Sequence, residues 1–164
     1  MLPTVMVRGD HLPVLAPLAA GQVAADVAAR AVVWGVDLGD AVTRAQAHRR
    51  LRQLAREIGA HMDGQSDLAH LFIAYSHRGR LHTGSCVSAA ARLASRLHAR
   101  WERDRGRYVD VVALDVTGCE DGELVRDRVM EAASGRAGAA GDVALTWDEI
   151  TDVSIHRAAM QELC

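Results

Sequence analysis

The chain has 164 residues, of which 49% are hydrophobic and 24% charged, and its formal net charge is -2 at pH 7. This length suits one domain that buries about two thirds of its unfolded surface, so folding requires no disulfide or metal. All nineteen Lys and Arg positions are arginine, and the lack of lysine excludes pyridoxal phosphate Schiff bases, Ser-Lys dyads and a complete Walker A loop.

The cysteines and the N-terminal residues indicate the cellular compartment of the protein. Cys86, Cys119 and Cys164 are widely spaced and odd in number, which favours a reducing cytoplasm. No basic stretch followed by a long apolar one opens the chain, and no segment has the length to span a bilayer. We therefore expect a cytoplasmic protein with no membrane partner, and the richness in Ala, Arg, Gly and Val indicates a GC-rich bacterial genome.

Charge is unevenly distributed along the chain. Residues 1–107 hold fifteen arginines and nine acidic residues, whereas residues 108–164 hold four arginines and twelve acidic residues. This asymmetry indicates an anion-binding face, or two complementary surfaces that meet within the fold or between subunits. We expect a homodimer, because opposed charges and apolar helix faces offer more adhesive surface than one small sheet covers.

The N-terminal part, residues 1–63, predicts one strand and two helices. Residues 4–8 predict a short edge strand. The Ala- and Val-rich residues 18–34 predict a largely buried helix. Residues 41–62 have the clearest amphipathic pattern in the chain, and Asp40 is the expected N-cap of this second helix.

The remaining core, residues 64–164, alternates between apolar runs of strand length and helical periodicity. The predicted strands are 68–76, 108–116 and 143–147, and the predicted helices are 85–104, 121–133 and 148–164. Residues 135–141 are rich in glycine and alanine and predict a flexible loop. The element order predicts a single α+β domain, with helices packed on a sheet of about four to five strands.

The densest polar cluster, at residues 77–86, lies between a predicted strand and a predicted helix. Gly79 and Gly84 have the spacing of a phosphate-binding loop, and Ser85 would cap a helix whose free amides attract an anion. Arg78 and Arg80 would then clamp a phosphate or carboxylate group. Arg78, Arg80, Gly84 and Ser85 are therefore the candidate ligand-binding residues.

A β-hairpin is an alternative structure for the same segment. The turn would lie at residues 77–80 and a short return strand at residues 81–83, which would feed the following helix. The polar tip would then be solvated and would bind nothing.

His77, His82, Cys86 and Asp115 are the candidate catalytic residues. His77 or His82 could act as the acid or base, and Cys86 at a helix start could be a nucleophile with His82 as its base. Asp115 ends the strongest predicted strand, where ligands bind in open α/β sheets. An aspartate there also commonly accepts loop amide hydrogen bonds or caps the next helix. The histidine spacings predict no metal site.

Arg92, Arg96 and Arg100 stand four residues apart, with Arg103 three residues further on, and form a stripe along one side of the helix predicted at 85–104. Together with Arg44, Arg49, Arg52 and Arg56, this stripe could bind a nucleic acid backbone. The chain has only one Phe, two Tyr and three Trp, which argues against base stacking. A solvated helix face, paired with nearby acidic residues, is the alternative.

These features predict a binding or regulatory module without a cofactor. It would recognise an anionic small molecule or an acidic protein surface through Arg78, Arg80 and the helix start at Ser85. One alternative is a small cofactor-independent enzyme that acts on a phosphorylated or carboxylated metabolite. Nucleic acid binding through the arginine stripe is a further alternative.

Overall fold

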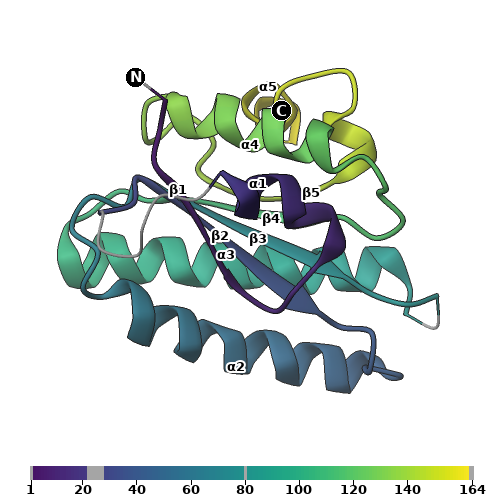
Figure 1. The fold of residues 1–164 in the computed structure, drawn as a ribbon. Coiled ribbons are helices and arrows are strands. Elements are labelled where there is room, and N and C mark those ends of the chain that lie inside the picture. The colour runs from purple at the N-terminus through teal and green to yellow at the C-terminus, as the bar shows by residue number, and fades with distance from the viewer. Residues whose placement is uncertain (1, 22–27, 80, 163–164) are drawn as a thin grey trace.

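A parallel sheet lies between two layers of helices in the computed structural model, which describes residues 2–21, 28–79 and 81–162 (Figure 1). The strands are β1 (Val5–Gly9), β2 (Ala31–Asp37), β3 (His70–Ser76), β4 (Asp110–Asp115) and β5 (Asp142–Thr146). The helices are α1 (Ala16–Ala20), α2 (Arg44–Met62), α3 (Thr83–Arg105), α4 (Gly122–Ser134) and α5 (Ile155–Glu162). The predicted single domain, with helices packed on a sheet, is confirmed.

The sheet has the strand order β1-β2-β3-β4-β5, and every neighbouring pair is parallel. The predicted edge position of the first strand is confirmed. In the register of β3 and β4, His70 lies opposite Asp110 and Tyr75 lies opposite Asp115. Because the strands are parallel, all their amino ends lie at one edge of the sheet and all their carboxyl ends at the other.

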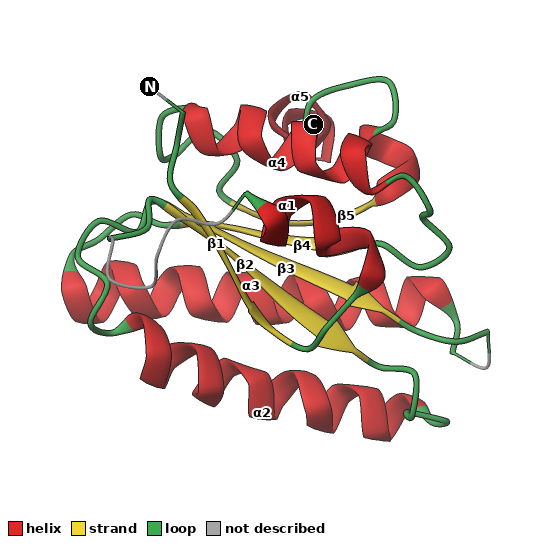
Figure 2. Ribbon diagram, in the orientation of Figure 1, coloured by secondary structure: helices red, strands yellow, loops and turns green. Residues whose placement is uncertain are grey.

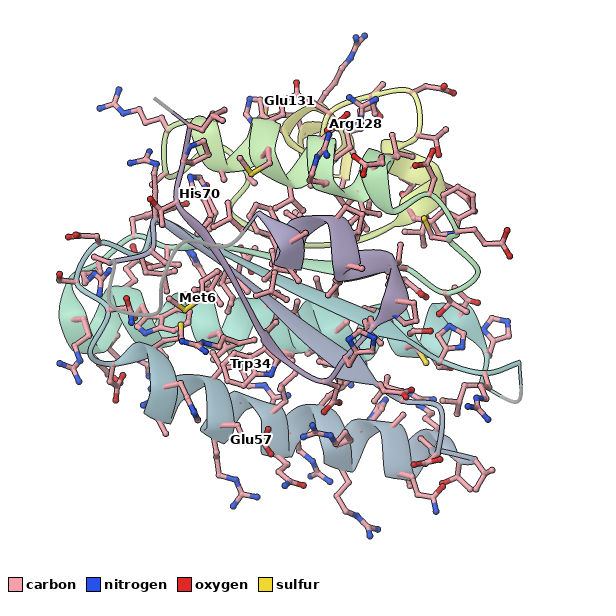
Figure 3. The ribbon with its side chains drawn as sticks, in the orientation of Figure 1. Met6, Trp34, Glu57, His70, Arg128 and Glu131 are labelled. Carbon is pink, nitrogen blue, oxygen red and sulfur yellow. The ribbon has the colours of Figure 1, made fainter. Side chains whose placement is uncertain are left out.

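Each face of the sheet is buried by its own layer of helices (Figure 2). Successive strand residues point to opposite faces, so in β3 Leu71 and Ile73 join the core under α2 and α3, whereas Phe72 and Ala74 join the core under α4. Trp34 lies on the α2 side and His70 on the α4 side (Figure 3). Burial of both faces accounts for the nearly continuous apolar runs of the central strands.

The crossover connections leave the sheet on different faces. α2 and α3 cross from β2 to β3 and from β3 to β4 on one face, whereas α4 crosses from β4 to β5 on the other. Since all these steps run in the same direction across the sheet, the α4 crossover has the opposite hand to the other two. The loops after β3 and β4 therefore diverge, which is the arrangement that opens crevices at carboxyl ends in α/β sheets.

The helix predicted at residues 18–34 is wrong. α1 ends at Ala20, residues 22–27 lie outside the described residues, and residues 31–37 form β2, whose first six residues are all buried. A buried apolar run looks alike in a central strand and in a buried helix, so hydrophobic periodicity does not separate them.

The predicted second helix exists, but it begins later than expected. Thr43, not Asp40, is the N-cap: its Oγ1 accepts a hydrogen bond from the Gln46 amide at 3.2 Å, and Gln46 Oε1 accepts one from the Thr43 amide at 3.1 Å. This reciprocal capping box satisfies two amides, which explains why the helix starts at Arg44.

The hairpin alternative for residues 77–86 is wrong, because β3 pairs in parallel with β2 and β4 and α3 already begins at Thr83. The helix predicted at 148–164 is shorter than expected, since a 3-10 turn at Trp147–Ile150 precedes α5. No helix within the described ranges combines the length and apolarity that crossing a bilayer requires.

Candidate functional site

The start of α3 differs from the predicted anion site. His82 is the N-cap, and its carbonyl accepts hydrogen bonds from the amides of Ser85 at 3.0 Å and Cys86 at 3.3 Å. The Ser85 amide is therefore already bonded within the first turn. Gly84, in the same turn, is exposed.

Of the two arginines of the predicted clamp, the structure describes only Arg78. Arg78 is exposed, and its guanidinium lies against the loop after β2: a Cβ built on Gly39 would lie 3.1 Å from Arg78 Nε. Arg80 lies outside the described residues. The Arg78 guanidinium therefore lies next to Gly39.

His77 and Asp115 meet where β3 and β4 end. His77 Nε2 lies 3.2 Å from Asp115 Oδ2, and the two residues are only 5% and 2% exposed. The His77 amide donates to Thr117 Oγ1 at 3.0 Å, and Asp115 Oδ1 accepts from the Thr117 amide at 2.9 Å. These contacts tie the two diverging loops together. A catalytic role for this pair remains a prediction, since a general base must reach a substrate proton and this ring faces a buried carboxylate.

Cys86 lies beneath the surface near the same pair. The residue is 2% exposed, and burial, together with the charge of Asp115, raises the pKa of its thiol. Such a thiol stays protonated, whereas a nucleophilic role requires a thiolate. His82, its predicted base, is exposed at the start of α3.

A groove runs between α2 and α3 and encloses about 840 Å³. Arg49 and Arg52 from α2, and Arg92 and Arg96 from α3, line it; we call it the arginine groove. A smaller cavity of about 230 Å³ lies next to it and is lined by residues that include Arg44, His48, His82 and Ser85. His48 lines both cavities, so the groove continues towards the start of α3.

The groove is strongly positive. α2 and α3 together carry ten arginines and only three acidic residues. Some of these arginines are paired: Arg50 lies 3.1 Å from Glu57, and Arg100 lies 3.6 Å from Asp63. In the part of the chain that the structure describes, no carboxylate lies within ion-pair distance of the four groove arginines. Of the predicted stripe, Arg92 and Arg96 line the groove, whereas Arg100 pairs with Asp63.

His48 was not predicted as a site residue. Its Nε2 is buried and has no hydrogen-bond partner among the described residues. Burial lowers the pKa of His48, and the positive charges of Arg44, Arg92 and Arg52 lower it further. The ring is therefore a neutral, unpartnered polar group beside several cations. Its four-residue spacing from Arg44 and Arg52 was the available sequence signal.

The described residues contain no group of three or more His, Cys, Asp or Glu side chains placed to hold a metal ion. Comparisons with protein-family models, with curated proteins and with solved structures find no match to this chain.

Proposed function

We propose that this chain is a binding module for a small, multiply charged anion, which it holds in the arginine groove. The observation that carries this proposal is the convergence of Arg49, Arg52, Arg92 and Arg96 from two helices, with no carboxylate of the described residues within ion-pair distance of them. Guanidinium groups keep their charge at all physiological pH values, so the free groove contains repulsion that a bound anion relieves.

The shape of the groove supports a ligand with two or more anionic groups. One pair of arginines lies on each wall, and the floor includes the buried residues Leu51 and Ala89. Guanidinium groups bind phosphate and carboxylate oxygens through paired hydrogen bonds. A polyphosphate or a polycarboxylate that bridges the two walls would engage both pairs, whereas a single small anion would engage one.

His48 adds a polar contact to this binding mode. The residue lines both the groove and the cavity beside Ser85, and its Nε2 is buried without a partner among the described residues. An anionic oxygen there would supply the missing partner and offset the field of Arg44, Arg52 and Arg92. The predicted anion site at the start of α3 is thus proposed as the end of a longer groove, with Arg44 in place of Arg78.

Titration calorimetry with inorganic tripolyphosphate tests the proposal. We expect saturable binding that is weakened about fivefold to tenfold by Arg52→Gln or by Arg92→Gln, because each variant removes one charge-assisted contact. Arg103→Gln is the matched control, since Arg103 is exposed on α3 and does not line the groove. Equal losses in all three variants would indicate only a general charge effect and would contradict the proposal.

A parallel titration with a single-stranded oligonucleotide separates this function from nucleic acid binding. A nucleic acid interface should bind the oligonucleotide much more tightly than tripolyphosphate, with an affinity that falls steeply as salt rises. The proposed small-anion site should prefer tripolyphosphate at equal phosphate concentration.

A further inference from the structure

A second cavity lies on the other face of the sheet, at the edge where β3 and β4 begin. It encloses about 300 Å³ between the sheet, α4 and the loop at residues 135–141, and we call it the amino-edge cavity. Its inner wall includes the apolar side chains of Phe72, Val112 and Ala140, all buried. α4 and the helices α2 and α3 cover opposite faces of the sheet (Figure 1), so this cavity and the arginine groove lie on opposite sides of the molecule.

A buried pair fixes one wall of this cavity. Asp110 is 1% exposed, and its Oδ1 accepts hydrogen bonds from the amides of Gly138 at 3.0 Å and Gly141 at 2.9 Å. Its Oδ2 lies 3.3 Å from His70 Nδ1. Burial alone would raise the pKa of Asp110, but the hydrogen bonds from His70 and from the Gly141 amide outweigh burial and lower it. The ionised carboxylate thus has partners on both oxygens and anchors the glycine-rich loop.

The loop conformation depends on its glycines. Gly138 and Gly141 have φ angles of 94° and 66°, in the left-handed region that residues with a side chain rarely adopt. Left-handed glycines let both amides turn towards Asp110, so this wall is formed before any ligand arrives. A pre-formed wall lowers the entropy that binding costs.

The interior suits a planar ring. The rings of His70 and Phe72 stack with centroids 6.3 Å apart and an angle of 18° between their planes, and both residues line the bottom of the cavity, where they are only 3% and 1% exposed. A mostly apolar cavity with few polar groups favours an apolar ring over a polar ligand body. Since a cavity of about 150 Å³ holds a benzene molecule, this one has room for one or two rings.

The rim offers one uncommitted positive charge. Arg136 is exposed and makes no ion pair with another described residue, whereas the nearby Glu131 lies 3.3 Å from the Arg128 guanidinium. Both members of that pair lie on α4, above the sheet (Figure 3). A ligand carboxylate would therefore find a free guanidinium at the rim, and a ligand ammonium group would find an acidic residue that is already paired.

We propose that the amino-edge cavity binds a planar carboxylic acid of one or two rings, with its ring beside Ala132 and Ala139 and its carboxylate on Arg136. NMR titrations with benzoate and naphthoate test this, with benzyl alcohol and naphthalenemethanol as neutral analogues. We expect both acids to shift the amide resonances of residues 135–141, and the acids to bind about threefold to fivefold more tightly than the alcohols, as one exposed ion pair allows.

One substitution at the rim and one inside the cavity, each with a control or a substitute variant, test where the ligand binds. Arg136→Gln should remove the preference for the acids, whereas Arg157→Gln, an exposed arginine outside the cavity, should keep it. Ala132→Leu should fill the cavity and abolish binding of acids and alcohols, and Ala139→Leu replaces it if the first variant does not fold. Arg92→Gln should change none of these affinities. Shifts confined to the arginine groove, or naphthoate binding that Ala132→Leu and Ala139→Leu leave intact, would overturn the proposal.

Discussion

The Nε2 atom of His77 lies 3.2 Å from Oδ2 of Asp115, where β3 and β4 end. His70 and Asp110 form a second buried pair where the same two strands begin. Each aspartate also accepts amide hydrogen bonds from a loop beside its strand. The two central strands are therefore joined by a histidine and an aspartate at both ends, and each pair holds a loop in place.

Asp115→Asn should lower the free energy of unfolding by about 1–3 kcal/mol, because it replaces one of two buried acceptor oxygens, which face His77 and the Thr117 amide, with an NH2 donor. Urea denaturation measures this change. Glu120→Gln, an exposed change in the same loop, should stay close to wild type. A midpoint for Asp115→Asn that equals the wild-type value would show that the pair does not stabilise the fold.

Asp110 should make stability depend on acid pH. Because its pKa is lowered in the folded state, the unfolded chain binds more protons in the range just below the ordinary pKa of aspartate. Its contribution is present above that ordinary value and is lost as pH falls through the lowered folded value. The free energy of unfolding of Asp110→Asn, measured by denaturation at a series of acid pH values, should lack this dependence on pH. If the free energy of unfolding falls with pH in the same way for the variant and the wild type, Asp110 does not make this contribution.

Anion binding in the arginine groove should strengthen as pH falls. Its neighbours lower the pKa of His48 in the free protein, and a bound anion should raise it, so that binding takes up a proton. Affinity should rise as pH falls below the ordinary value of 6.5, by up to about tenfold for each unit by which the anion raises the pKa. Ethanedisulfonate is a suitable probe, because its sulfonates stay ionised. His48→Gln should show a flat profile, and an unchanged slope would exclude His48 from the site.

Gly35→Ala should destabilise the fold by about 1–3 kcal/mol through overpacking. An added Cβ on β2 would collide with the backbone carbonyl oxygen of Asp10, which cannot rotate away. Gly79→Ala is the matched control, since no atom of a described residue other than its chain neighbours lies within 4 Å of the added Cβ. Thermal denaturation of the two variants compares them, and equal melting temperatures would contradict this view of β2 packing.

The central strands could be predicted from sequence because their residues are apolar over the full length of a strand. β3 and β4 lie within the predicted ranges 68–76 and 108–116, and α4 begins one residue later than predicted, after Asp121 as its N-cap. β2 was missed, because its apolar run follows an Ala-rich stretch with helical spacing. The parallel order could not be predicted, because it depends on contacts between residues far apart in the chain.

The candidate site could be predicted only in part. The spacing of Arg92 and Arg96 shows that they share one face of a helix. Arg49 and Arg52 lie opposite Arg92 and Arg96 because of the way α2 packs against α3. The sequence of one helix alone does not predict this packing. Arg100 belongs to the same stripe, yet Asp63 at the end of α2 draws it away. The amino-edge cavity was missed because glycine-rich residues 135–141 predict only flexibility, whereas the loop conformation depends on Asp110.

Mapping the tripolyphosphate site by NMR tests the central claim most directly. The side-chain Nε resonances of arginine report on each guanidinium separately. We predict that saturation with tripolyphosphate shifts the signals of Arg49, Arg52, Arg92 and Arg96 together and leaves that of Arg103 unchanged. Shifts at Arg78 without shifts in the groove, or no saturable shift at any arginine, would contradict the account.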